Sequence, residues 1–311
     1  MEVFTERVVE TGKGRLRFRR ENLTGLSCRI SPERIKRGID RFSTLDFPPG
    51  ECPFCDANLS TATPVFPDGK RILVGESVTF PNLYPFAEWH TVTVISRDHR
   101  VLSFTPGQLV DAMTGQLESL RGHDGYPSIN WNFLPSAGAS LAHPHLQGLV
   151  DRMPSPLAAR YLAGSEDYAR EHGRRYADDL REAEAESGRI LRDGRILWLA
   201  PSVPLGEKEI RGILPISHLS RFEPILGDLV RDLLGIIAFY EKIGTHAFNF
   251  SLFFDREGCE RGFSAFCSII ARINPNQLSM SDSSFMERLH LEPVILTLPE
   301  ELARMYREKM G

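Results

Sequence analysis

Hydrophobic and polar residues alternate with a period of two over several short segments in the first half of the chain. This period places successive side chains on opposite faces of an extended strand and therefore predicts strands. Residues 106–120 instead follow a helical pattern, with Thr105 as the expected N-cap. The predicted strands are residues 72–74, 77–86, 90–95 and 129–133.

Part of this pattern recurs later in the chain. Residues 94–99 resemble residues 214–218, a helical pattern over 224–243 follows, and residues 129–133 resemble residues 248–252. The His99–His218 and Asn130–Asn249 offsets agree without a gap. We interpret this as two similar α+β halves; chance similarity between two ordinary strand–helix–strand units is the alternative.

The same offset aligns His143 with Gly262 and His145 with Ser264, so the second half lacks both histidines. A charged helical run over residues 155–190 is predicted to link and cover the halves, and residues 299–306 to form an amphipathic helix. The predicted division is an N-terminal half over 1–154, a linking region over 155–190 and a C-terminal half over 191–311.

Composition narrows the class of protein. The 311 residues are 41% hydrophobic and 25% charged, as in globular proteins that bury a substantial core. A net charge of −4 gives no reason to expect a nucleic-acid or membrane surface. The N-terminus has no signal-peptide pattern, and no apolar run is long enough to span a bilayer, so we expect a cytoplasmic protein.

Five cysteines, sparse and odd in number, do not suit a disulfide framework. Cys52 and Cys55 form a C-x-x-C knuckle, a spacing that suits a tetrahedral zinc ion with two further ligands from elsewhere. A redox pair is the competing interpretation. No thioredoxin-like strand–helix pattern surrounds the knuckle, which favours metal binding.

Arg34 and Arg37 lie three residues apart after a Ser-Pro turn. On a helical turn the two guanidinium groups would face the same way and could bind one phosphate. A solvated basic turn is the alternative, and the residues alone favour it.

The segment with the most specific chemistry contains His143, Pro144, His145 and Gln147. Residues two apart in an extended segment face the same way, so both histidines and the glutamine can project into one cavity. Proline restricts the backbone of the pair. This pattern suggests a histidine nucleophile for a phosphorus centre with a neutral amide donor nearby. Taken alone, however, the motif is more often two ordinary surface or core histidines.

Small residues precede the motif. Gly138 and Ser140 are expected to leave backbone N–H groups accessible to a bound phosphate.

Five segments, taken in chain order, resemble those of the galactose-1-phosphate uridylyltransferase family of the histidine triad superfamily. They are residues 31–37, 52–55, 80–84, 96–99 and 132–147. The resemblance covers nearly the whole chain, strongly in the first half and weakly in the second. It implies an α+β fold of two histidine-triad-like halves, each an antiparallel sheet with packed helices, related by a degenerate internal repeat.

The resemblance also implies site residues. A structural zinc ion would be bound by Cys52, Cys55, His99 and His143. His145 would be the nucleophile, and Gln147 would donate to a phosphoryl oxygen. The other implied substrate contacts are Asn132, Gly138 and Ser140 at the phosphates, Phe54, Asn82 and Tyr84 near the base and ribose, and Arg34 and Arg37 across a homodimer interface.

Three features depart from that family. Leu83 replaces an aspartate beside the ribose, the second-half histidine metal pair has no counterpart around residues 262–268, and residues 285–290 keep little beyond Phe285 of a hexose-contact segment.

The implied function is transfer of a nucleoside monophosphate from a nucleotide sugar to a sugar 1-phosphate, through a nucleotidyl-histidine intermediate. An amide at Gln147 donates without acting as a base for water, which favours transfer over hydrolysis. One alternative is a phosphorylase of ADP-sugars or dinucleoside polyphosphates, and another is a non-catalytic nucleotide-binding protein.

Overall fold

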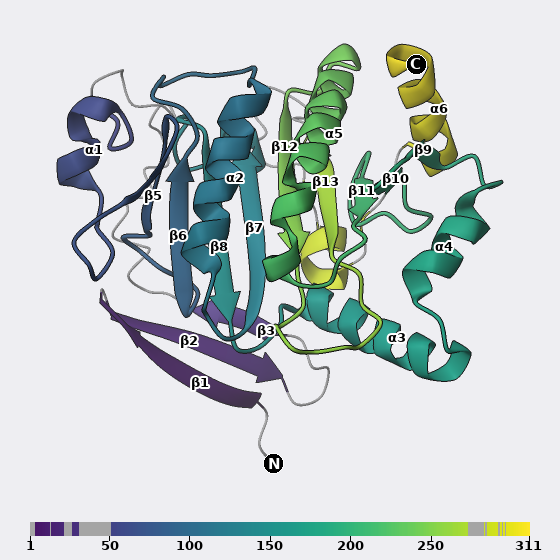
Figure 1. Cartoon of the computed structure of the whole chain (residues 1–311), viewed down its shortest axis with the longest axis horizontal. Coiled ribbons are helices and arrows are strands. Elements are labelled where there is room, and N and C mark those ends of the chain that lie inside the picture. The colour runs from purple at the N-terminus through teal and green to yellow at the C-terminus, as the bar shows by residue number, and fades with distance from the viewer. Residues whose placement is uncertain are drawn as a thin grey trace.

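The computed structural model of the chain describes most of its residues. They are residues 4–12, 14–21, 27–30, 51–272, 283, 285–291, 293, 295 and 297–311. Arg34 and Arg37, the predicted phosphate-binding pair, lie outside the described residues. The described part has an α+β fold in which one large antiparallel sheet is covered by helices (Figure 1).

The large sheet has ten strands in the order β4-β5-β6-β8-β7-β12-β13-β11-β10-β9. The strands from the first part of the chain are β4 (Ile72–Val74), β5 (Ser77–Pro81), β6 (Trp89–Val94), β7 (Tyr126–Phe133) and β8 (His145–Asp151). Those from the second part are β9 (Ile190–Asp193), β10 (Leu197–Leu199), β11 (Ile210–Ile213), β12 (Ala247–Phe253) and β13 (Phe266–Arg272). Each edge of the sheet is therefore built from one part of the chain.

The two parts of the chain join where β7 pairs with β12. Trp131, Phe133 and Phe248 pack together at this seam, with ring centroids 5.0–5.4 Å apart. All three are almost fully buried. The three side chains belong to a single hydrophobic core that both parts of the chain share. Burial of each large apolar side chain stabilises the fold by about 1.5–3 kcal/mol.

Two helices, α2 (Pro106–Leu120) and α5 (Glu223–Lys242), pack against each other on one face of the sheet (Figure 1). The predicted start of α2 is confirmed, because the Thr105 side chain accepts from the backbone N–H of Gln108 and the Gln108 side chain accepts from that of Thr105. The strand predicted over residues 77–86 ends earlier, at Pro81. The Asn82 side chain there accepts from the N–H of Tyr84 and turns the chain.

The predicted helical run over residues 155–190 is interrupted. One helix ends at Gly173, whose φ of +66° is a conformation that other residues rarely adopt. The next helix ends at Glu184. The remaining helical elements are α1 (Asp56–Ala62), α3 (Pro156–His172), α4 (Tyr176–Glu184), α6 (Pro299–Met310), the 3-10 turns η2 (Pro135–Ala137) and η3 (Leu219–Arg221), and the π-turn η4 (Met286–His290). α6 confirms the predicted C-terminal helix.

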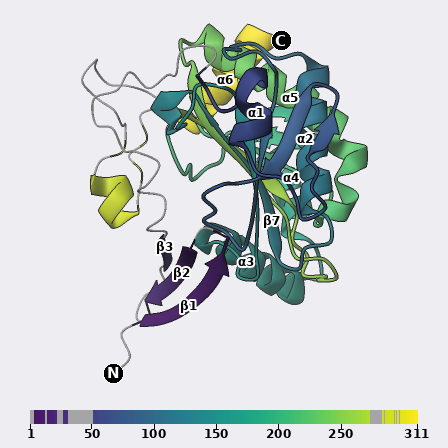
Figure 2. The ribbon, with the colours of Figure 1, turned by 90° about the vertical axis from the view of Figure 1, so that its left-hand side faces the viewer.

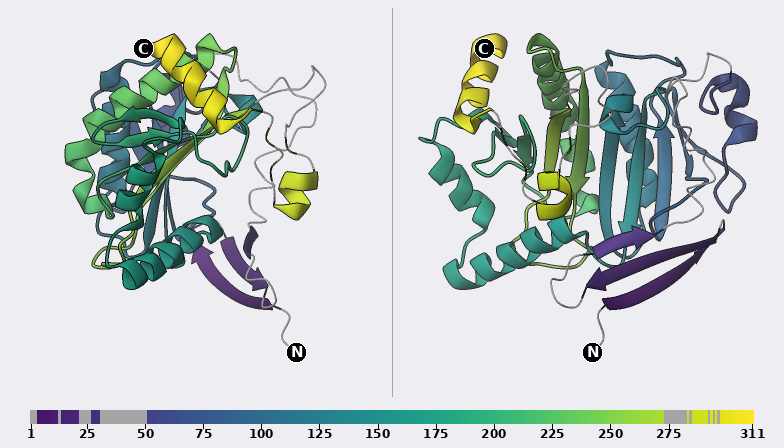
Figure 3. Two further views of the ribbon diagram at one scale, coloured as in Figure 1. Left: turned by 90° about the vertical axis from the view of Figure 1, so that its right-hand side faces the viewer. Right: turned by 180° about the vertical axis from the view of Figure 1, so that it is seen from behind.

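Both halves of the sheet follow the same order of elements, namely three strands, a helix and two strands. A separate sheet of β1 (Phe4–Thr11), β2 (Gly14–Glu21) and β3 (Ser27–Ile30) projects from the main body (Figure 2). Seen from behind, the face of the large sheet opposite α2 and α5 has α3 crossing near its lower end (Figure 3). Within the described ranges, no helix combines the length and apolar character needed to cross a membrane.

Candidate active site and metal centre

Cys52, Cys55, His99 and His143 come together from three separate parts of the chain. We call these four residues the metal cluster. Their candidate ligand atoms all lie within 4.8 Å of one another, and in the described part of the chain this is the one such group of cysteine, histidine and acidic side chains. Sγ of Cys55 lies 3.3 Å from Nδ1 of His99, and Nδ1 of His143 lies 3.8 Å from Sγ of Cys52.

These distances suit zinc. A tetrahedral zinc ion with Zn–S bonds of about 2.3 Å and Zn–N bonds of about 2.0–2.1 Å separates its sulfur and nitrogen ligands by about 3.5 Å. Two thiols and two imidazoles are also the donor types that zinc prefers. The donor set and its spacing therefore fit a closed, structural zinc site.

Hydrogen bonds prepare His143 for this role. Its Nε2 lies 2.8 Å from the carbonyl oxygen of Ser96, which can only accept, so Nε2 carries the proton and the lone pair of Nδ1 faces the cysteines. Burial lowers the pKa of the His143 imidazole, which favours the neutral form that binds metals. Burial also raises the pKa of the Cys52 thiol to about 11, and a bound cation is what would stabilise a thiolate there.

His145 begins strand β8, two residues after His143. Its Nδ1 lies 2.9 Å from the carbonyl oxygen of His143. Because that oxygen only accepts, the proton of the neutral ring is on Nδ1 and the lone pair is on Nε2. The ring is 6% exposed and packs edge-on against Phe54, with centroids 5.2 Å apart. The arrangement presents an imidazole of fixed tautomer, as a nucleophile requires.

Gln147 faces the same side of the sheet as His145, as the alternation of β8 predicted. Its Oε1 lies 3.0 Å from Nε2 of His90, and Nδ2 of Asn82 lies 3.0 Å from the same nitrogen. The N–H of Phe86 donates to Nδ1 of His90 at 3.3 Å, so the proton of the neutral ring is on Nε2, which donates to Oε1 of Gln147. Binding of Oε1 by His90 leaves the amino group of Gln147 to donate elsewhere. Phe54, Asn82, His90 and Gln147 thus border one region beside His145.

The loop between β7 and β8 contains the other predicted phosphate contacts. Gly138 has a φ of +86° and ends the 3-10 turn η2. Its N–H donates to the carbonyl oxygen of Pro135 at 2.8 Å. The expectation that this N–H is accessible to a phosphate is therefore wrong, because the turn itself uses the donor. Ser140 is exposed in the same loop.

Asn132, at the end of β7, is held by residues from the other half of the sheet. Nδ2 of Asn249 donates to Oδ1 of Asn132 at 2.7 Å and to the carbonyl oxygen of Ala137 at 2.8 Å. Nη1 of Arg272 in turn donates to Oδ1 of Asn249 at 2.6 Å. Since Oδ1 of Asn132 accepts from Asn249, the side chain of Asn132 keeps its amino group as a donor for another partner.

Sequence reasoning missed the supporting roles of His90, Asn249 and Arg272. The sequence pattern predicted His90 only as part of a strand, although it is a polar residue on the same face of β6 as Val92 and Val94. Asn249 appeared only as the counterpart of Asn130. The available signal was the alternation itself, which places each of these polar side chains on the sheet face that also bears Gln147.

The remaining predicted positions are dispersed. Tyr84 follows Asn82 and Leu83 in the turn after β5. Phe285 is 62% exposed. In the second half, Gly262 has a φ of +69°, and Ser264 accepts a hydrogen bond from Arg175, so neither position supplies an imidazole as His143 and His145 do.

Comparison with known proteins supports the fold. No family model matches the chain. The chain is 25% identical over 303 residues to an uncharacterized protein of Archaeoglobus fulgidus, with 94% of this chain and 91% of that protein covered. A solved uridylyltransferase matches with a TM-score of 0.74 and 19% identity, and an ADP-glucose phosphorylase from Arabidopsis thaliana with bound ADP-glucose matches with 0.68 and 20%. Each covers 94% of this chain and 98% of the other.

These likenesses confirm, at the level of the fold, the resemblance to uridylyltransferases found in the sequence. The chain shares the fold of these solved structures over 94% of its length.

Proposed function

We propose that this chain is a nucleotidyltransferase that moves a nucleoside monophosphate from a nucleotide sugar to a sugar 1-phosphate through a nucleotidyl-His145 intermediate. The observation that carries the proposal is the hydrogen bond between Nδ1 of His145 and the carbonyl oxygen of His143. It keeps the ring proton on the nitrogen that does not react, and it aims the lone pair of Nε2 at the substrate side of the sheet.

The reaction then proceeds in two displacements. Nε2 of His145 attacks the α-phosphorus, the bond between that phosphorus and the bridging oxygen breaks, and the electron pair leaves with the sugar 1-phosphate. The imidazole becomes positively charged while its Nδ1 proton stays bonded to the carbonyl of His143. A phosphate oxygen of the acceptor next attacks the same phosphorus, and the Nε2–phosphorus bond breaks to restore the neutral ring. No proton has to be removed from the neutral imidazole nitrogen that attacks first or from the phosphate oxygen that attacks second.

Two amides support the transferring phosphoryl group. The amino groups of Gln147 and Asn132 are left to donate because the carbonyl oxygens of both side chains are engaged, by His90 and by Asn249. Neutral donors stabilise the negative charge that develops on the phosphoryl oxygens. Neither amide can take a proton from water, which favours transfer over hydrolysis.

Cys52, Cys55, His99 and His143 would hold the zinc ion, which supplies rigid anchoring and has no open coordination site for substrate. His143 then joins the anchored cluster to the nucleophile two residues away. Pro144 limits the freedom of the backbone between them. Precise support of this kind is what a reacting imidazole needs.

Other parts of the proposal rest on the resemblance found in the sequence. The chain would act as a cytoplasmic homodimer of two histidine-triad-like halves related by a degenerate repeat, divided at residues 154 and 190. The base and ribose would lie near Phe54, Asn82 and Tyr84, and the phosphates near Gly138 and Ser140. Arg34 and Arg37 would reach phosphates across the dimer interface.

The test is covalent labelling. Purified protein is incubated with UDP-glucose or ADP-glucose carrying ³²P at the α-phosphorus, and acid-labile label is measured on the protein. We expect about one label per chain, and none with the His145→Ala variant. A His172→Ala variant, which changes an exposed histidine on α3, should label normally. Tight nucleotide binding without label or turnover would instead indicate a non-catalytic binding protein.

A phosphorylase of ADP-sugars or dinucleoside polyphosphates is the second candidate function. Leu83 favours it, because a leucine cannot make the hydrogen bond to the ribose that the resemblance implies. The labelled enzyme is offered inorganic phosphate, glucose 1-phosphate or galactose 1-phosphate, and the loss of label is timed. Faster release by a hexose phosphate supports the transferase, and faster release by inorganic phosphate supports the phosphorylase.

A further inference from the structure

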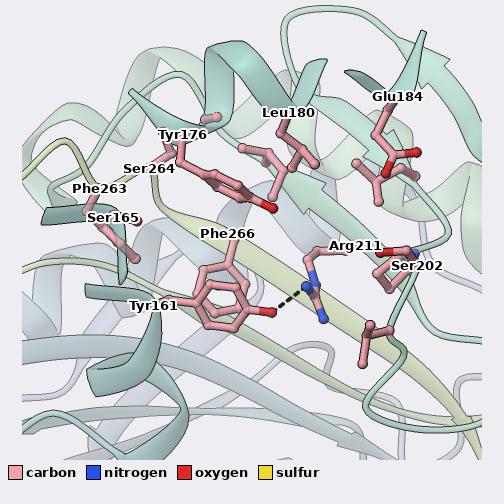
Figure 4. Close-up of a pocket in the computed structure, with 15 residues that line it drawn as sticks. Tyr161, Ser165, Tyr176, Leu180, Glu184, Ser202, Arg211, Phe263, Ser264 and Phe266 are labelled. Carbon is pink, nitrogen blue, oxygen red and sulfur yellow. Dashed lines mark hydrogen bonds between the residues drawn. The ribbon is translucent and has the colours of Figure 1, made fainter. Parts of the chain in front are cut away.

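A cavity lies away from His145, over β11 and β13, and is covered by α3 and α4 (Figure 4). Its volume is about 190 Å³. It opens on the sheet face that bears Gln147. Directly paired residues on neighbouring strands point to the same face, and the pairing continues strand by strand from Gln147 to Arg211. β13 lies three strands from β8, which is about 14 Å at the usual strand spacing. The cavity is therefore separate from the site proposed above.

The position of this cavity in the second half corresponds to that of the nucleophile in the first half. His145 stands opposite Val94, the last residue of β6, just as Phe266 stands opposite Ile213, the last residue of β11. Phe266 lines the cavity. The second half therefore has a cavity at the corresponding place, with Phe266 where the first half has His145. The constant sequence offset, which predicted Ser264 at this position, is wrong here because the register of the paired strands decides the equivalence. Such a cavity can bind a ligand but lacks the imidazole of the first half.

Arg211 supplies hydrogen-bond donors at the floor of the cavity. It is 7% exposed, and Nε and Nη2 donate to Oε1 of Glu209 at 3.0 and 2.7 Å. Nη1 donates to the hydroxyl of Tyr161, as the dashed line in Figure 4 shows. These bonds use three of the five N–H groups of a guanidinium, and no other described residue accepts from the remaining two.

The charge of Arg211 is already compensated. Glu209 is 1% exposed, and its carboxylate also accepts from the Ser268 hydroxyl and the N–H of Leu205. The buried pair therefore offers donors to a ligand without a net positive charge. Burying an additional anion beside such a pair is unfavourable, because its charge would have no counter-ion. The floor thus favours an uncharged acceptor such as a carbonyl oxygen.

The walls favour a flat ring. Tyr161 and Phe266 pack together with ring centroids 4.5 Å apart, and the Arg211 guanidinium lies 5.3 Å from the Tyr161 ring centre. Phe263 also lines the cavity, and Tyr176 on α4 lines it from the opposite wall (Figure 4). Cavities for drug-sized ligands measure about 300–1,000 Å³, so this one has room for a single small ring system.

We propose that this cavity binds a neutral planar heterocycle with a ring carbonyl, the chemistry of the base in uridine or inosine. The ring lies against the aromatic walls, and the carbonyl oxygen accepts from Arg211. The inference concerns a site distinct from the His145 site and does not depend on the proposed transfer reaction.

The test is equilibrium binding of uridine, inosine and adenosine, measured by isothermal titration calorimetry. Adenosine is the comparison ligand because its base has no ring carbonyl. Ala177→Trp on α4 fills the cavity, and Ala183→Trp adds the same side chain at an exposed position on that helix. We expect Ala177→Trp to weaken uridine binding at one site at least tenfold, and Ala183→Trp to leave it unchanged.

A paired variant tests the floor. Glu209→Gln with Arg211→Met removes the buried ion pair as a unit and so leaves no lone charge. We expect it to abolish the preference for uridine over adenosine. A uridine site at this cavity that Ala177→Trp leaves unchanged in affinity and stoichiometry, adenosine that competes equally well for the site lost in that variant, or benzoate that binds there more tightly than uridine would each overturn the proposal. Labelling of His145 in the Ala177→Trp variant is measured alongside, so failure of the transferase proposal is recognised separately.

Discussion

The carbonyl oxygen of His143 lies 2.9 Å from Nδ1 of His145, and the ring of His143 lies with its own Nδ1 toward Cys52 and Cys55. His143 therefore belongs to the metal cluster through its side chain and orients the His145 ring, the proposed nucleophile, through its backbone. Because the two residues are separated only by Pro144, a displacement of the cluster would be transmitted to His145. The stability of the cluster and the reactivity of the imidazole should be coupled.

Replacing a cluster thiol tests this coupling. We expect Cys52→Ser to lose stoichiometric zinc, to lower the free energy of unfolding by more than about 2 kcal/mol and to reduce labelling of His145, because structural zinc binding contributes directly to folding. Metal content is measured by mass spectrometry and stability by urea denaturation. Cys259→Ser, outside the cluster, should retain the metal, stability and labelling. Normal labelling by a metal-free Cys52→Ser protein would contradict the coupling.

Asn249→Ala should slow the proposed nucleotidyl transfer although Asn249 belongs to the second half of the sheet. The substitution removes the donor that engages Oδ1 of Asn132, so the Asn132 amide is free to rotate away from its donating orientation. Loss of one or two such hydrogen bonds costs about 1–3 kcal/mol, or roughly 10- to 100-fold in rate. Single-turnover kinetics provides the measurement. Ser251→Ala, on the same face of β12, is the control and should react at the normal rate.

The pH dependence of stability should include a contribution from His123. Its ring stacks on Trp89 with centroids 3.9 Å apart, and burial lowers its pKa below the ordinary value of 6.5. The folded protein therefore binds this proton less readily than the unfolded chain, so stability is present above about pH 6.5 and is lost as the pH falls below it.

We expect His123→Phe to reduce the loss of unfolding free energy between pH 7.5 and pH 5.5, as measured by urea denaturation at each pH. His246→Phe, which replaces an exposed histidine, should keep the original dependence. An unchanged dependence in His123→Phe would show that burial of this ring does not contribute.

Gly148, in the middle of β8, has no room for a side chain. An added Cβ would lie 2.0 Å from Oε1 of the fully buried Gln116 and 2.7 Å from Oγ1 of Thr91. Gly148→Ala should therefore lower the free energy of unfolding by about 1–3 kcal/mol through overpacking. Gly164→Ala on α3 meets no atom within 4 Å and should raise it by about 0.5–1 kcal/mol, since alanine favours a helix. Thermal and urea denaturation measure both.

Local patterns were sufficient for much of the fold. The period of α2, its Thr105 cap, and the alternation of β6 and β7 depend on residues close together in the chain, and the structure confirms them. The interruption at Gly173 was missed because charged residues with helical periodicity continue on both sides of it. The accessible N–H predicted at Gly138 was wrong because a 3-10 turn, which short-range composition did not reveal, uses that donor.

The sequence by itself determined which groups are available: two thiols at knuckle spacing, two imidazoles two residues apart, and an amide on the same face of a strand. Only the tertiary structure decided the tautomer of His145, the engagement of Asn132 by Asn249, and the cavity above Arg211. Each of these depends on atoms that are distant in the chain or on a particular backbone carbonyl. Hydrogen bonds and close contacts are set by distances of a few ångströms, and residue spacing along one strand does not specify which strand lies beside it.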